Sequence, residues 1–316
     1  VGPTDPVPFY TIFTGMMLVQ LFYWGTNQQI IQRALGAKDL KEGQKGLLLA
    51  SFIKILGPII VVLPGIIAFH LFQGNLESAD SAYPMLVKKV LPTAWVGFFA
   101  AVLFGAILSS FNSVLNSSVT LFGIDVYKQH INKEADEKTI VKYGKIFGIV
   151  LAIAAMFIAP LIANAGSLFD YLQEINGIYS IPILTIIVVG YLTKRVPAIA
   201  AKIGLASGCL LYIASQFFMQ PYFVSNALKL AKGNGVTDEA ALALIEAQAY
   251  PHFLDVMALL FILNVGIMLL IGKLYPRKEG FVQEHTKQVD ITPWKYTTQA
   301  GIAICVIVIG IYIYFS

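Results

Sequence analysis

The stretch Gln20-Leu-Phe-Tyr-Trp-Gly-Thr-Asn-Gln-Gln29 places the aromatic pair Tyr23-Trp24, a glycine and four amides inside one apolar segment, Phe9–Ile31. A helix rising about 1.5 Å per residue would bring Gln20 roughly 15 Å deep, near the middle of a bilayer core of about 30 Å. Polar groups at that depth face a partner helix or a wet cavity. Gly25 predicts a discontinuous helix, the usual construction of a transporter's midplane site. The alternative is that the aromatics pack and the amides join helices.

Composition decides the class of protein. Hydrophobic residues make up 57% of the 316-residue chain and charged residues only 13%, and the mean hydropathy is +0.72. A soluble protein of this length could not bury so much apolar surface, so the chain is expected to be an all-α, multi-pass protein of the bilayer. The net charge of +4 is too small to suggest nucleic acid as a partner.

Eight apolar segments are predicted, with alternating charge at their flanks. Seventeen of the 22 Lys and Arg residues follow the first, third, fifth and seventh segments, so this side is expected to be cytoplasmic and both chain ends to lie outside. The predicted membrane is the inner or plasma membrane. The segments are Phe9–Ile31, Gly46–Phe69, Trp95–Tyr127, Gly144–Ala163, Ser167–Leu192, Ala198–Met219, Phe253–Tyr275 and Thr297–Phe315.

Lys54 is the one Lys or Arg residue that remains when those flanking the spans on both sides are counted. It lies eight residues beyond Gly46, about 12 Å from the cytoplasmic edge. The side chain could extend part of that way toward the headgroups. An intramembrane lysine is rare, however, and is typical of a site that faces the bundle interior.

The third segment carries a run of small oxygen-bearing side chains. Such residues allow helices to approach closely, and serine can bond back to its own helix, so packing is one interpretation. The other is a site for a hard cation such as sodium, which prefers oxygen ligands. The run consists of Ser109, Ser110, Ser113, Asn116, Ser117, Ser118 and Thr120.

Other elements are predicted outside and within the later spans. A surface helix is expected over Tyr83–Val90, and an exposed helix over Asp238–Gln248 with Thr237 as its N-cap. Gln173 lies near 10 Å in the fifth segment, which Pro182 interrupts. The chain has no HExxH, CxxC, GxSxG or phosphate-cradling glycine motif, so no enzyme activity is expected.

The chain resembles the sodium/solute symporter family in four places. These are the quoted stretch when it is extended to Arg33, the residue Lys54, the run from Ser109 to Tyr127, and Leu168-Phe-Asp-Tyr-Leu-Gln173. The similarity covers nearly the whole chain. It is closest to the sodium/glucose and sodium/galactose cotransporter branch, because the Tyr-Trp pair, the intramembrane lysine and the glutamine after Phe-Asp-Tyr are specific to sugar carriers.

The resemblance implies sodium-coupled symport of a monosaccharide. By position, the sugar would contact Gln20, Tyr23, Trp24, Lys54 and Gln173, and the co-transported sodium ion would bind to Ala106, Ser109 and Ser110. Gln20 departs from the bacterial galactose carrier, which has asparagine there. The alternatives are a symporter of inositol, an anion or another organic solute, and a non-transporting sensor or scaffold with the same fold.

The resemblance also implies the second half of an inverted-repeat, LeuT-like transporter fold. Residues 1–195 would form the second five-helix repeat, and residues 196–316 three peripheral helices with an outer loop at 220–251. The first repeat would be a missing N-terminal part of the same polypeptide. That part would supply the other half of both sites.

Overall fold

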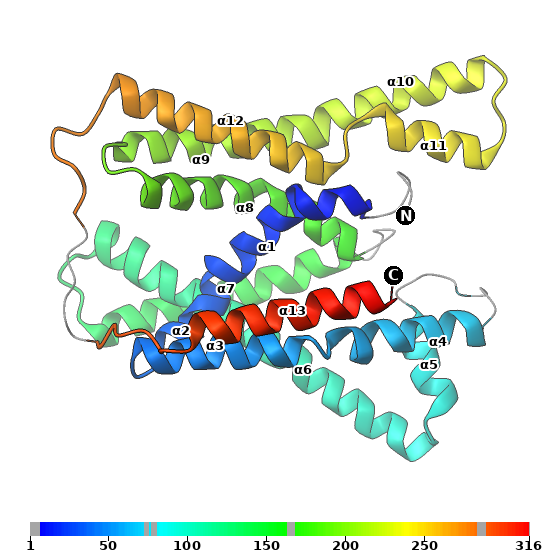
Figure 1. Ribbon diagram of the computed structural model, residues 1–316, viewed down its shortest axis with the longest axis horizontal. Helices are drawn as coiled ribbons and strands as arrows, with labels where there is room; N and C mark the ends of the chain where they lie inside the picture. The colour runs from blue at the N-terminus through cyan, green and yellow to red at the C-terminus, as the bar shows by residue number, and fades with distance from the viewer. Residues whose placement is uncertain (1–6, 73–75, 77–80, 163–167, 283–288, 316) are drawn as a thin grey trace. The chain divides into compact units, whose positions relative to one another are not determined.

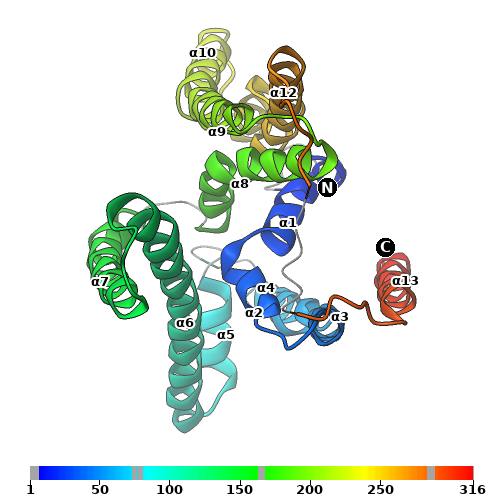
Figure 2. The same cartoon turned by 90° about the vertical axis from the view of Figure 1, so that its left-hand side faces the viewer.

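The computed structural model describes residues 7–72, 76, 81–162, 168–282 and 289–315, and all regular structure in these ranges is helical (Figures 1 and 2). The elements are η1 (Phe9–Phe13), α1 (Gly15–Gly25), α2 (Gln28–Leu35), α3 (Leu40–Lys54), η2 (Pro58–Val62), α4 (Leu63–Leu71), α5 (Ala82–Val90), α6 (Thr93–Leu121), η4 (Phe122–Ile131), α7 (Glu137–Ile162), α8 (Leu168–Leu192), α9 (Ala198–Ile213), η5 (Ala214–Met219), α10 (Gln220–Gly233), α11 (Glu239–Ala249), α12 (Phe253–Leu274) and α13 (Thr297–Phe315).

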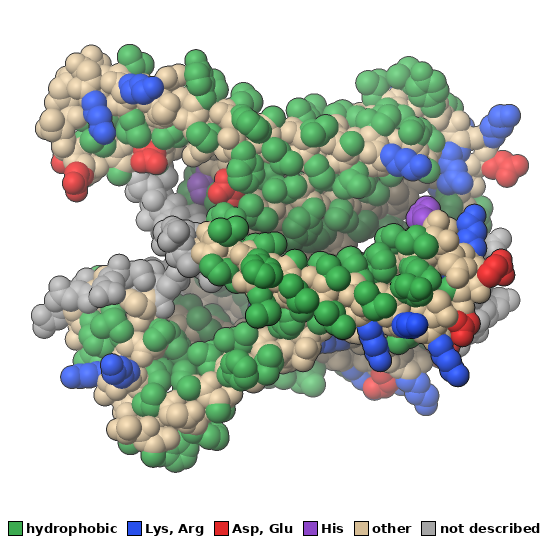
Figure 3. Space-filling model, turned by 180° about the vertical axis from the view of Figure 1, so that it is seen from behind, with side chains coloured by type: hydrophobic (Ala, Val, Ile, Leu, Met, Phe, Trp, Pro, Cys, Tyr) green, Lys and Arg blue, Asp and Glu red, His purple; other side chains and the backbone are tan. Residues whose placement is uncertain are grey.

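Seven helices in the described part of the chain are long and apolar enough to cross a membrane. They coincide with the second to eighth predicted segments, which confirms an all-α, multi-pass membrane protein. Large hydrophobic side chains on these helices face outward; Phe157 and Leu161, for example, are each 76% exposed. Figure 3 shows such side chains along the helices, with Lys and Arg concentrated toward helix ends. This distribution is expected where lipid is the solvent.

Element boundaries agree with the predictions at α5, α12 and α13 to within one residue. Two predictions were wrong. The sixth segment does not end at Met219 but continues through η5 and α10 to Gly233. The N-cap of α11 is Asp238 rather than Thr237, because the Asp238 carboxylate accepts a hydrogen bond from the Ala241 N–H (3.0 Å). The ends expected at Ala163 and Ser167 lie outside the described residues.

The helices pack into two compact units, each built from separate parts of the chain. Unit 1 comprises residues 1–27 and 169–285, and unit 2 comprises residues 28–168 and 286–316. The division of the chain into a repeat at 1–195 and peripheral helices at 196–316 stays a prediction.

The core of unit 1 joins α1, α8, α9 and α12. Its buried members come from all four helices, with Val19 on α1, Ile181 on α8, Tyr212 on α9, and Leu254 and Met257 on α12. Glycines let the backbones approach closely, as small residues do in membrane bundles. A Cβ at Gly15, for example, would lie 1.9 Å from the Leu254 carbonyl oxygen. Only glycine, which has no Cβ atom, allows α1 to approach the backbone of α12 this closely.

A buried polar contact lies where α8, α9 and α12 meet. Asn264 is 1% exposed, and its Oδ1 accepts a hydrogen bond from Ser207 Oγ (3.1 Å). Gly208 packs against Asn264 and Pro182. A Cβ at position 208 would lie 2.2 Å from Asn264 Nδ2 and 2.7 Å from Pro182 Cγ. Gly208 therefore sets the spacing of the three helices.

In unit 2, α6 packs against α2, α5 and α7. Two stacked aromatic pairs join α7 to η4: Phe122 with Phe147 (4.1 Å between centroids) and Tyr127 with Tyr143 (4.5 Å). The C-terminal helix α13 packs on α3, where Gln44 Oε1 accepts from the Trp294 N–H (2.7 Å) and Thr297 Oγ1 (2.8 Å).

Asp290 shapes the segment that leads into α13. Its carboxylate accepts hydrogen bonds from Thr292 Oγ1 (2.6 Å) and the Thr292 N–H (2.9 Å). These bonds to the charged form lower the pKa of Asp290 below its ordinary value, with Lys41 contributing in the same direction. The Asp290 carbonyl accepts from the Leu40 N–H (3.0 Å), which joins this segment to the start of α3.

We expect Gly208→Ala to destabilise the protein by about 1–3 kcal/mol, the usual cost of overpacking, because the added methyl group collides with Asn264 and Pro182. Gly266→Ala on α12 is the matched control, since a Cβ there meets no atom within 4 Å. Chemical denaturation in detergent micelles measures both variants. Equal stability of Gly208→Ala and wild type would contradict the described helix spacing.

Candidate functional site

The helix α1 has two different faces. Val19 and Phe22 are buried, and Phe22 contacts Tyr179 of α8 edge to face (5.8 Å between centroids). The other face carries Gln20, Tyr23 and Trp24, which are exposed or half-buried. The buried face therefore fixes the direction in which the predicted sugar-contacting residues point.

The exposed face of α1 is held together by its own contacts. Trp24 Nε1 donates a hydrogen bond to Gln20 Oε1 (3.0 Å), as the i, i+4 spacing on a helix permits. Tyr23 lies edge to face with Trp24 (5.1 Å between centroids). The three side chains thus form one aromatic and amide surface.

The predicted helix break after Gly25 is present. Three donors converge on the Phe22 carbonyl oxygen: the N–H groups of Thr26 (2.9 Å) and Asn27 (3.1 Å) and the Thr26 hydroxyl (2.8 Å). Thr26 has left the helical conformation with ψ −16° and φ −137°, and α2 begins at Gln28. The Phe22 carbonyl at the end of α1 is therefore paired within the chain, as the backbone of a helix inside a membrane must be.

Gln173 is half-buried on α8 in unit 1, the unit that also contains α1. One residue after Gln173, α8 is joined to α9, because the Glu174 carbonyl accepts a hydrogen bond from the Tyr212 hydroxyl (2.9 Å). Gly177 then packs against Tyr212, with no room for a Cβ (2.4 Å). Unit 1 therefore contains four of the five predicted sugar contacts.

Lys54, the fifth, is the last residue of α3 in unit 2. The chain tightens after it, with hydrogen bonds from Ile55 N–H to the Phe52 carbonyl (3.1 Å) and from Leu56 N–H to the Ile53 carbonyl (3.0 Å), before the π-helical turn η2 begins at Pro58. A positive charge is favourable at a helix C-terminus, and π-helical turns are frequent at functional sites. This irregularity was not predicted, although Gly57-Pro58 was a signal for it.

The oxygen-bearing run on α6 divides into two groups. Four hydroxyls bond back to carbonyl oxygens of their own helix at 2.8–3.0 Å, namely those of Ser113, Ser117, Ser118 and Thr120. Those of Ser109 and Ser110 make no hydrogen bond within the described residues, and both residues are exposed, as is Ala106. Packing therefore accounts for the first group, while the hydroxyls of two predicted sodium ligands, Ser109 and Ser110, keep free oxygen atoms within the described residues.

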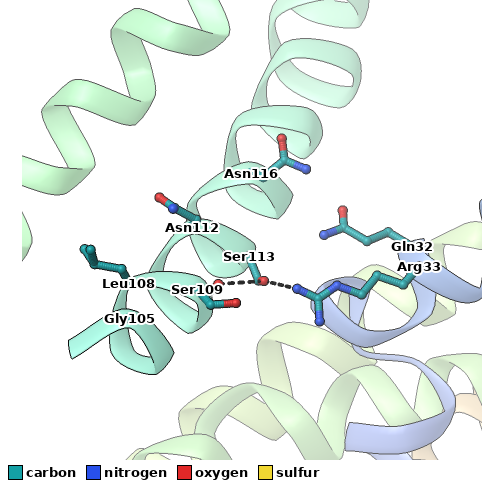
Figure 4. A pocket seen from close by; sticks show the side chains of 8 residues that line it. All are labelled: Gln32, Arg33, Gly105, Leu108, Ser109, Asn112, Ser113 and Asn116. Carbon is teal, nitrogen blue, oxygen red and sulfur yellow. Dashed lines mark hydrogen bonds between the residues drawn. The ribbon is translucent and has the colours of Figure 1, made fainter. Parts of the chain in front are cut away.

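A cavity of about 730 Å³ lies between α2 and α6 in unit 2 (Figure 4). Ser109 lines it, whereas Ala106 and Ser110 do not. Arg33 extends from α2 across the cavity and donates a hydrogen bond to Ser113 Oγ, which in turn donates to the Ser109 carbonyl (2.9 Å). The lining is Gln32, Arg33, Gly105, Leu108, Ser109, Asn112, Ser113 and Asn116.

Arg33, Gln32 and Asn112 were not predicted as site residues. Arg33 was predicted only as one of the cations on the cytoplasmic side. No local sequence pattern predicts its hydrogen bond to a serine 80 residues later. The i, i+4 spacing of Asn112 and Asn116, which puts two amides on one face of α6, was an available signal.

We expect Gln20→Leu to release the Trp24 indole, because the hydrogen bond from Nε1 is lost while the side-chain volume is nearly kept. Fluorescence anisotropy of Trp24 should fall in a background where Trp95 and Trp294 are replaced by phenylalanine. Met17→Leu, on the same helix, is the control. Unchanged anisotropy would show that Gln20 does not position the ring.

Residues 4–208 match the family model for the sodium:solute symporter family. The chain is 43% identical over 312 residues to "Uncharacterized symporter YidK" of Escherichia coli, covering 98% of this chain and 50% of that protein. It is 38% identical over 209 residues to the sodium/glucose cotransporter of Vibrio parahaemolyticus (61% of this chain, 38% of the relative). It is 33% identical over 226 residues to the human sodium/myo-inositol cotransporter 2 (66% and 33%). The chain thus spans half or less of the length of these relatives. It belongs to the sodium:solute symporter family, whose members are transporters and not enzymes.

Proposed function

We propose that this protein couples the inward movement of sodium to the uptake of a monosaccharide of the glucose or galactose type. The observation that carries the proposal is the aromatic and amide face of α1, with Trp24 bonded to Gln20 and stacked edge to face with Tyr23. An aromatic ring covers the apolar C–H face of a pyranose, and a nearby amide rewards a correctly placed hydroxyl.

The remaining sugar contacts proposed are Gln173 and Lys54, an amide and an ammonium group. Polar groups of a site that hydrogen-bond substrate hydroxyls discriminate against analogues without them. The proposed sodium ligands are the free hydroxyls of Ser109 and Ser110 and the carbonyl of Ala106. Hydroxyl and carbonyl oxygens suit a hard monovalent cation without adding a carboxylate.

A cyclic polyol is the second candidate substrate. The similarity to the human sodium/myo-inositol cotransporter 2 favours it, and a polyol ring presents hydroxyls and C–H faces much as a pyranose does. Competition by myo-inositol against labelled glucose and galactose separates the two substrates. The mechanism of coupling would be the same for either.

The test is reciprocal binding by the protein as its gene encodes it, reconstituted in nanodiscs. Sodium should raise the affinity for the hexose, and the hexose should raise the affinity for sodium by the same factor, because coupling free energies are reciprocal. Isotherms for each ligand with and without the other measure this. Potassium in place of sodium is the control, and independent isotherms would leave the protein without symport.

Lys54→Ala should weaken hexose binding by roughly 1.5–3 kcal/mol, the typical value of a hydrogen bond to a charged group, or about one to two decades in affinity. The loss should be selective, since a deoxy-sugar without the contacted hydroxyl should bind both proteins almost equally. Lys45→Ala is the control on the same helix, where Lys45 pairs with Glu42 at the surface (2.7 Å). Equal losses across a panel of deoxy-sugars would point to a general structural defect instead.

A further inference from the structure

We infer that the Arg33 guanidinium competes with the transported sodium ion for α6, so that Arg33 sets how tightly sodium is held. The inference rests on the sodium coupling proposed above. Its starting point is the hydrogen bond from Arg33 on α2 to Ser113 Oγ on α6, two helices that pack together within unit 2.

Ser113 differs from the other back-bonded hydroxyls of α6. Ser117, Ser118 and Thr120 bond only to their own helix, whereas Ser113 also accepts a hydrogen bond from a charged group. Ser113 is 8% exposed, so this contact is shielded from solvent at one end. Two hydrogen bonds in series then join the guanidinium to the Ser109 carbonyl oxygen (2.9 Å from Ser113 Oγ).

The charge of Arg33 is not balanced by the residues that the structure describes. Arg33 is the one charged residue lining the cavity, and the single ion pair found in the described ranges joins Lys45 to Glu42. Arginine does not lose its proton at any physiological pH. A fixed positive charge therefore lies in the same cavity as Ser109, which is a proposed sodium ligand.

Charge repulsion opposes simultaneous occupancy by sodium and Arg33. Like charges repel, more strongly where the surroundings are less polar than water. The hydrogen bond to Ser113 holds the guanidinium on α6, the helix that carries all three proposed sodium ligands. α6 is therefore a poorer sodium site while Arg33 is docked.

This arrangement solves a problem of ion transport. An ion that crosses with its solute must bind firmly enough to enter and weakly enough to leave. A tethered cation on a neighbouring helix can dock on Ser113 of α6 as sodium departs. By linkage, sodium weakens the docking of Arg33 by the same factor that docking weakens sodium.

The experiment measures the binding of radioactive sodium to the protein as its gene encodes it, purified in nanodiscs. Arg33→Gln should lower the sodium concentration for half-saturation by about fivefold or more, a modest coupling between two sites. Ser113→Ala, which keeps the charge but removes the docking hydroxyl, should shift it in the same direction. The double variant should show less than the sum of the two effects, because both act through one contact.

Matched controls separate this role from charge or hydroxyl content in general. Lys38→Gln removes an equal charge in the exposed stretch after α2, and Ser118→Ala removes a hydroxyl that bonds to the Val114 carbonyl of α6. Neither should change the half-saturating sodium concentration. If Arg33→Gln does not fold, Ser113→Ala and its comparison with Ser118→Ala still test the inference.

The outcomes distinguish the two proposals. Unchanged or weaker sodium binding in Arg33→Gln and Ser113→Ala, with saturable binding in the wild type, overturns the competition while sodium coupling stands. Absence of sodium binding in the wild-type protein overturns both.

Discussion

A polar group inside a bilayer has no water to bond to, and this constraint explains most of the local structure of this protein. At the end of α1, the Phe22 carbonyl accepts hydrogen bonds from Thr26 and Asn27, which pair it within the chain where the helix stops. On α6, four hydroxyls are satisfied by carbonyls of the same helix. Against this background, the oxygens that the described residues leave free, on Ser109 and Ser110, are the informative ones.

The same constraint made much of the fold predictable. Long apolar runs had to become helices, so the seven long spans and the surface helix α5 were found from hydropathy alone. Gly25 with four nearby amides correctly indicated a break in the first segment. Residue identity was sufficient in these places because a helix satisfies its backbone locally.

Contacts between distant parts of the chain were not predictable in the same way. The Arg33–Ser113 bond spans 80 residues, and its partners are an ordinary loop-flanking cation and one serine among several. The π-helical turns at Pro58 and before Pro221 were missed because a proline can either end a helix or be accommodated by a wider turn. For the candidate site, the sequence supplied residue types through family resemblance. The structure added how these residues are arranged. Above all, it shows which hydroxyls on α6 bond to their own helix and which are free within the described residues.

Close backbone contacts at glycines fix the positions of the unit 1 helices that carry candidate site residues. Gly15 presses α1 against the Leu254 backbone, and Gly177 presses α8 against Tyr212. The residues proposed to contact solute, Gln20 and Gln173, are thus carried on helices whose positions are fixed by the opposite faces. Preorganisation of this kind reduces the entropy lost when a ligand binds.

The bond between Gln44 and the start of α13 has a consequence for how the protein is made. Its partners are 250 residues apart, so at about 5–20 residues per second α3 is synthesised roughly 12–50 s before Trp294 leaves the ribosome. During that interval Gln44 Oε1 lacks its Trp294 and Thr297 donors, and the α3 surface that later receives α13 is not yet covered by it. Among the described helix pairs of unit 2, the α3–α13 pair is the last whose two partners have both been synthesised.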